Sequence, residues 1–143
     1  MKSWIWLRAL AVLLALFAAG HTLGTAAPHV TRGPREAALF ADMQGFRFPI
    51  MGFDRTYWEF YRGFALTISV LLAAMMVIAW QLASISRRSG RAALPMAITL
   101  QCACIGLLVL GRMFFFGGPI VMSAGAVLLS TAAVVALARE PAP

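Results

Sequence analysis

The chain has 143 residues, of which 62% are hydrophobic and 12% are charged, and its formal net charge at pH 7 is +7. A soluble domain carries about 25% charged residues, so a chain this short and apolar is expected to need a bilayer around it. Its length allows one domain. The basic residues are scattered and form no basic run mixed with polar loop, so we expect no nucleic-acid partner.

Four apolar segments follow one another along the chain, at about residues 4–23, 63–83, 92–110 and 119–137. Each is close to the roughly 20 residues that a helix needs to cross a bilayer, and none shows the alternation of a strand. The sequence therefore predicts an all-α, polytopic membrane protein. We expect a four-transmembrane-helix bundle with a long, partly helical first loop, residues 24–62, capping the outer face.

The first apolar segment has a second interpretation. Residues 1–27 also fit a cleaved signal peptide, with a basic start, an apolar core and small residues near the end. Trp4 and Trp6 make the apolar stretch longer than a usual signal core, and tryptophan is common at membrane interfaces. We therefore favour a retained membrane helix and keep cleavage as the alternative.

Basic residues predict the orientation in the membrane. Four crossings place six of them on the side of both termini: Lys2, Arg8, Arg87, Arg88, Arg91 and Arg139. The other side also has six: Arg32, Arg35, Arg47, Arg55, Arg62 and Arg112. The loop at residues 84–91 is short, basic and free of acidic residues, whereas the first loop mixes its arginines with acidic residues. We therefore expect an inner-membrane protein with cytoplasmic N- and C-termini.

The first loop is too long to be a plain connector. Pro34 suits the first position of a helix that would continue to Gln44 and stop at Gly45. Residues 46–53 alternate apolar and helix-breaking residues, and we interpret them as an ordered cap folded back over the bundle. A loose loop that only touches lipid headgroups is the alternative.

Residues 54–64 hold four charges and five aromatic side chains just before the second apolar run. Thr56 and Glu59 have the spacing of a capping box, and Glu59 is also spaced to pair with Arg55 or Arg62. Tyrosine and tryptophan here are typical membrane-interface anchors. The functional alternative is a pocket for the headgroup of a ligand, with these candidate binding residues: Tyr57, Trp58, Tyr61, Arg62, Arg55 and Arg112.

His21 lies near the end of the first predicted helix, at the edge of the hydrocarbon layer. An ionisable residue at this depth needs a partner, and we name Glu59, Asp54 or Tyr57 as candidates. His21, Glu59 and Asp54 are therefore the candidate catalytic residues for acid–base chemistry. The alternative is a histidine that hydrogen-bonds a neighbouring helix and fixes its packing.

The sequence predicts neither a metal site nor a cofactor. Cys102 and Cys104 point to different faces of one helix, and His29 lies in a loop away from the helical His21. No phosphate-binding loop, zinc motif or nucleophile elbow occurs in the chain.

Three stretches carry a family resemblance: His-Thr-Leu-Gly at 21–24, Met-Gly-Phe-Asp-Arg-Thr-Tyr-Trp-Glu-Phe-Tyr-Arg-Gly-Phe at 51–64, and Trp-Gln-Leu at 80–82. Together they resemble a family of small bacterial four-helix integral membrane proteins of unknown function. The resemblance covers roughly the first 85 residues. It implies the fold and the place of the site, but no activity. The architecture is also similar to four-helix sterol isomerases and sterol receptors, none of whose motifs is present.

Two functions follow as expectations. The first is a membrane protein that binds a lipid-like ligand or a membrane partner through an outer-face polar and aromatic pocket. The small-residue faces of the helices also allow a homodimer. The second is a small membrane enzyme that acts on a lipid-like substrate with a histidine–carboxylate pair. The two differ in whether His21 lies within hydrogen-bond reach of a carboxylate beside an open cavity.

Overall fold

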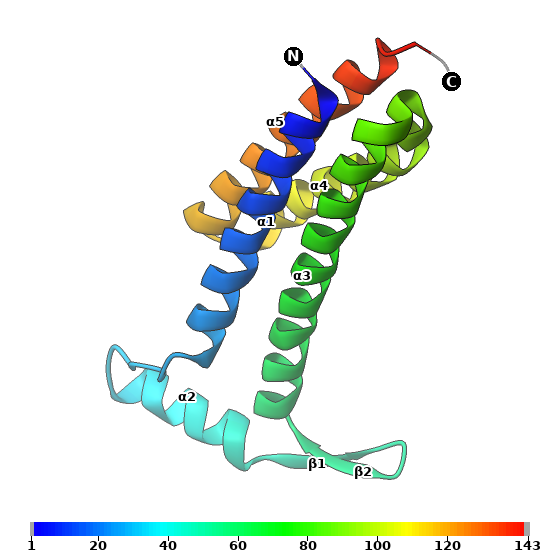
Figure 1. Cartoon of the computed structure of the whole chain (residues 1–143). Coiled ribbons are helices and arrows are strands. Elements are labelled where there is room, and N and C mark those ends of the chain that lie inside the picture. The colour runs from blue at the N-terminus through cyan, green and yellow to red at the C-terminus, as the bar shows by residue number, and fades with distance from the viewer. Residues whose placement is uncertain (1, 142–143) are drawn as a thin grey trace. The chain divides into compact units, whose positions relative to one another are not determined.

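The computed structural model describes residues 2–141 (Figure 1). In chain order the elements are α1 (Ser3–Ala26), α2 (Pro34–Gly45), β1 (Arg47–Ile50), β2 (Phe53–Thr56), α3 (Tyr57–Ser89), the 3₁₀ turn η1 (Gly90–Ala93), α4 (Leu94–Phe114) and α5 (Gly117–Ala138). They form two compact units, which we describe separately. Residues 2–18 and 71–141 make up the helical unit, and residues 19–70 make up the aromatic unit.

The prediction of a mostly helical protein with apolar helices of membrane-spanning length is confirmed. Three helical stretches are long and apolar enough to cross a membrane: Ser3–Ala26, Tyr57–Phe114 and Gly117–Ala138. The second stretch contains α3, η1 and α4. The predicted boundary of α3 was wrong, because that helix begins at Tyr57 rather than near residue 63.

In the helical unit, α4 and α5 pack closely through small residues. The buried positions on α5 recur at intervals of three and four residues: Ser123, Ala126, Ser130, Ala133 and Leu137. Gly111 of α4 lies close enough that an added Cβ would be 3.8 Å from Ser123 Oγ. Small side chains let helix backbones approach closely in lipid, where van der Waals packing holds helices together. Gln101 Nε2 also donates to Thr131 Oγ1 across this pair at 2.9 Å, as one expects of an intramembrane amide.

The aromatic unit contains the folded first loop. The predicted helix is confirmed, since α2 begins at Pro34 and ends at Gly45. The sequence predicts an ordered cap over residues 46–53 but no strands, whereas β1 and β2 form an antiparallel hairpin that pairs Ile50 with Phe53. Its two-residue turn has positive φ angles, 49° at Met51 and 83° at Gly52, which match the right-handed twist of a tight hairpin. The protein is therefore helical with one small sheet.

Candidate functional site

The start of α3 is fixed by a capping box, as predicted. Glu59 N donates to Thr56 Oγ1 at 3.1 Å, and Thr56 N donates to Glu59 Oε2 at 2.8 Å. Each residue thus satisfies a backbone N–H that a helix end leaves without a partner. The ion pairs that the spacing allows are not formed, because among residues 2–141 Glu59 has no ion pair with Arg55 or Arg62. The cap therefore holds the Glu59 carboxylate at the mouth of the helix.

One side of α3 is covered by the loop and α2. The Trp58 ring lies edge-on to Phe40 of α2 at 5.5 Å and stacks with Tyr61 at 5.4 Å, measured between ring centroids. His29 lies against Phe40 at 3.9 Å and reaches Trp58 at 5.9 Å. Such pairs contribute roughly 0.5–1.5 kcal/mol each beyond the area they bury. Trp58 therefore anchors α2 and the preceding loop.

The hairpin is held by a second group of rings. Phe48 of β1 contacts Tyr57 at 4.8 Å and Phe60 at 5.7 Å, and Phe46 stacks on Tyr57 at 5.9 Å. A two-stranded hairpin is marginally stable alone, so these contacts fix its place on α3. Tyr57, predicted as a ligand contact, thus packs the hairpin, although 55% of its surface remains exposed.

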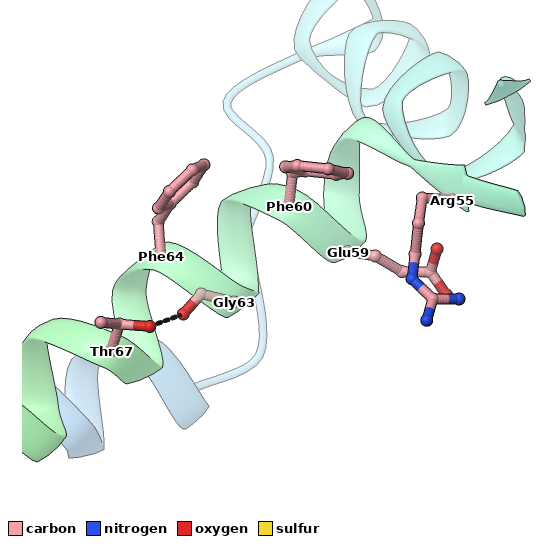
Figure 2. Close-up of a pocket in the computed structure, with 6 residues that line it drawn as sticks. All are labelled: Arg55, Glu59, Phe60, Gly63, Phe64 and Thr67. Atoms are coloured by element: carbon pink, nitrogen blue, oxygen red, sulfur yellow. Dashed lines mark hydrogen bonds between the residues drawn. The ribbon is translucent and has the colours of Figure 1, made fainter. Parts of the chain in front are cut away.

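An open groove of about 310 Å³ runs along another side of the same helix. Its lining residues are Arg55, Glu59, Phe60, Gly63, Phe64 and Thr67 (Figure 2). Figure 2 shows the Phe60 and Phe64 rings on one side of α3, with Arg55 and Glu59 together near its start. Thr67 Oγ1 donates to the Gly63 carbonyl at 2.9 Å, so its hydroxyl is turned to the backbone. The groove therefore has a charged end and an apolar floor.

The absence of a side chain at Gly63 keeps the middle of the groove open. A Cβ added there would meet no atom within 4 Å. The rings of Phe60 and Phe64 contact each other beside it, with 6.1 Å between their centroids. The site can therefore accept an apolar chain that lies against the two rings.

The structure brings only part of the predicted site together. Of the residues named from the sequence, Arg55 and Glu59 line the groove. Four others lie outside it: Tyr57, Trp58, Tyr61 and Arg62. Arg112 belongs to the helical unit, where it is exposed in the last turn of α4. The residues missed from the sequence are Phe60, Gly63, Phe64 and Thr67, which recur at three- and four-residue intervals on one helix face.

Within residues 2–141, His21 bonds to none of its three expected partners, Glu59, Asp54 and Tyr57. His21 Nδ1 is hydrogen-bonded to Ser69 Oγ at 3.0 Å, and Ser69 is buried. Ser69 is ten residues beyond Glu59 on α3, which corresponds to about 15 Å of helical rise. Asp54 is exposed in the hairpin. His21 therefore ties α1 to α3 within the aromatic unit, as the packing alternative predicts.

The cysteines lie as their spacing predicts, with Cys102 exposed and Cys104 buried, and neither is in a disulfide. Among the described residues, no group of three or more histidine, cysteine, aspartate or glutamate side chains could hold a metal ion.

Comparisons of the chain with known protein families, with curated proteins and with solved structures found no significant match. The family resemblance therefore stays a prediction, and the geometry above carries the functional argument.

Proposed function

We propose that this protein binds an amphipathic, lipid-like ligand in the groove on α3. The observation that carries the proposal is the continuity of a charged end, at Arg55 and Glu59, with the apolar floor at Phe60, Gly63 and Phe64. The groove begins at the first turn of a helix apolar enough to cross a membrane, which is where lipid headgroups meet hydrocarbon.

The chemistry of the charged end limits the ligand class. A guanidinium suits a phosphate or carboxylate, because its fixed N–H groups match two oxygens at once. Glu59 uses Oε2 in the cap, which leaves Oε1 for a hydroxyl or ammonium group of the ligand. The ligand would therefore carry an acidic group, a hydrogen-bond donor and an aliphatic chain that lies against Phe60 and Phe64.

We also propose that the chain crosses an inner membrane four times, with both termini in the cytoplasm. The support for these crossings is the break between α3 and α4 at Gly90, whose φ of 48° lies in the left-handed region. α4 alone has 21 residues, or about 32 Å of helix, which is enough for one crossing. The basic residues of the turn then give the orientation by the positive-inside rule.

Native mass spectrometry of the detergent-purified protein tests the groove by detecting a ligand that co-purifies. Gly63→Leu should fill the groove without harming the helix, since leucine is the better helix former and the space beside Gly63 is open. Arg55→Gln removes the charge at the headgroup end. We expect both variants to lose the ligand, at least about tenfold, as for a loss of about 1.4 kcal/mol.

Arg62→Gln is the matched control for Arg55→Gln of β2, because Arg62 is an exposed arginine on α3 outside the groove. It should retain the ligand as the unmodified protein does. Equal retention in Gly63→Leu and the unmodified protein would refute the proposal. Loss of a dimer in Gly63→Leu, with no ligand detected in any sample, would show instead that the groove receives a second copy or another membrane partner.

A further inference from the structure

The helical unit contains a second charged hollow, separate from the groove on α3. It has a volume of about 370 Å³ and is lined by Lys2, Trp4, Ser86, Arg87 and Glu140. These residues lie at or beside the start of α1, the end of α3 and the end of α5. The α1 and α5 positions are ends of helical stretches apolar enough to cross a membrane. The α3 position lies just before the break at Gly90, where the proposed crossings of α3 and α4 meet, so headgroups are expected around the hollow.

The floor of the hollow is a chain of hydrogen bonds. Ser3 Oγ donates to Glu140 Oε1 at 2.5 Å and is also hydrogen-bonded to Ser86 Oγ. Because Ser3 has a single hydroxyl proton, the Ser86 hydroxyl is then the donor in the second bond. Both serines are buried, so the chain joins three helix ends and fixes the Glu140 carboxylate. Glu140 is the only acidic residue after Glu59 in the sequence.

Glu140 keeps a second oxygen for another partner. Oε1 accepts from Ser3, while Oε2 points toward Gly90, where an added Cβ would lie 3.0 Å from it. Any other residue at 90 would crowd this oxygen and would also be strained by the φ of 48°. The bare backbone at Gly90 thus makes room for the carboxylate itself.

Two cations stand around the same hollow without neutralising that carboxylate. The Arg87 guanidinium lies over the Trp4 ring, 5.1 Å from its centroid, which holds the arginine at the rim. Lys2 lines the hollow as well. Within the described part of the chain, neither cation forms an ion pair with Glu140. Lys2 and Arg87 therefore line the same hollow as Glu140 without forming an ion pair with it.

We propose that this hollow binds the headgroup of phosphatidylethanolamine. Its phosphate would lie between Lys2 and Arg87, and its ammonium group would donate to Glu140 Oε2. A purely anionic headgroup would leave Glu140 unmatched and repelled, whereas a zwitterion with a primary amine satisfies both signs of charge. The indole of Trp4 belongs at this depth, since tryptophan is enriched at the membrane interface.

The test uses the full-length protein in detergent micelles that contain equal amounts of dioleoyl phosphatidylethanolamine, phosphatidylcholine and phosphatidylglycerol. Retained lipids are counted by native mass spectrometry. We expect phosphatidylethanolamine to be retained about tenfold over the other two, a difference of about 1.4 kcal/mol. Phosphatidylcholine carries the same charges but has no N–H to donate to Glu140. Water-soluble phosphoethanolamine should not displace the lipid, and equal binding of that compound would overturn the assignment to a lipid.

The variants separate charge from structure. Glu140→Gln keeps an oxygen that can accept from Ser3 but removes the negative charge, so the preference for phosphatidylethanolamine should disappear. Arg87→Gln should lower retention of all three phospholipids. Arg139→Gln is the matched control, because Arg139 is the exposed neighbour of Glu140 and does not line the hollow. Circular dichroism confirms that each variant is folded.

Two results would overturn the proposal. One is an unchanged preference in Glu140→Gln, and the other is a preference of the unmodified protein for phosphatidylglycerol. An equal loss in Arg139→Gln would also refute it, since the effect would then come from the net charge of this end of the protein. None of these variants alters the groove at Arg55, so the two proposals can fail separately.

Discussion

The helical unit and the aromatic unit are stabilised in different ways. In the helical unit, side chains such as Leu14, Ala126 and Ala133 are completely buried between helices. In residues 19–70, by contrast, only Thr56 and Ser69 are buried. The aromatic unit relies instead on ring contacts at the foot of α3 and on short polar bonds, such as the capping box. The first unit is therefore a packed core, and the second is a surface arrangement.

This difference indicates where ligand chemistry is placed. Four of the five acidic residues of the chain lie within the aromatic unit, as do the rings that remain half exposed. Regions with few buried contacts open more easily and tolerate exposed functional groups, whereas packed regions resist change. We therefore expect substitutions to act globally in the helical unit and locally in the aromatic unit, and three variants test this.

Leu14→Ala should have the largest effect. Leu14 is 0% exposed, so truncation leaves a cavity between helices and should cost roughly 3 kcal/mol of unfolding free energy, near the low end for buried leucines. The value is low because lipid, unlike water, offers the unfolded segment an apolar surrounding. Thermal unfolding in detergent, followed by circular dichroism, measures it. Leu16→Ala is the control, since Leu16 is 61% exposed and should cost less than about 0.5 kcal/mol. Equal losses in the two variants would mean that α1 is not packed as described.

Trp58→Ala should have the next largest effect, and it should be local. The substitution removes the contacts of Trp58 with His29, Phe40 and Tyr61, worth about 2 kcal/mol together. Hydrogen exchange of the α2 amides should then accelerate roughly thirtyfold, while the amides of α4 and α5 keep their protection.

Phe53→Ala is the control for that experiment, because Phe53 is 61% exposed and its ring contacts the guanidinium of Arg55 rather than α2. It should leave exchange in α2 unchanged. If Trp58→Ala speeds exchange in α4 as much as in α2, the two units unfold together and the comparison drawn above is wrong.

The sequence predicts the helices of this protein well because their signal is local. Apolar runs of about 20 residues identify α1, α4 and α5, and Pro34 and Gly45 delimit α2. The start of α3 was predicted several residues too late, because its first turn is polar and aromatic and hydropathy alone does not identify it. The capping box at Thr56 already marked the true start.

The hairpin was missed for a physical reason. Its turn is Met51-Gly52 rather than Asn-Gly or Asp-Gly, and Met51 adopts a φ of 49° that such a residue rarely takes. Pro49 lies within β1, and proline normally counts against a strand. The hairpin forms because Phe48 packs on Tyr57 and Phe60, which is a tertiary contact.

The candidate site was half predicted for a similar reason. Residue type pointed to tyrosine, tryptophan and arginine, but the helix face decides which of them remain accessible. Trp58 is covered by Phe40, whereas Phe60 and Gly63 line the open groove. His21 is hydrogen-bonded to Ser69, 48 residues away, because the alignment of α1 and α3 brings these two side chains together. No local pattern reports such an alignment.

Thr56→Ala should have the smallest effect of the three. It removes the hydroxyl that accepts from Glu59 N, which should cost about 1 kcal/mol, a typical value for a lost N-cap. Exchange of the first-turn amides of α3 should rise about fivefold. Thr56→Ser keeps the acceptor and should restore protection, and Thr31→Ala, an exposed loop position, should change nothing.

The same variant distinguishes the two roles of Glu59, which both caps α3 and lines the groove. Without the hydroxyl of Thr56, the first turn frays and the Glu59 carboxylate is less firmly held, so ligand retention should fall modestly in step with the amide protection. Thr56→Ser should recover both. If Thr56→Ala loses protection but keeps all of its ligand, Glu59 only caps the helix, and Arg55 with the phenylalanines must account for binding.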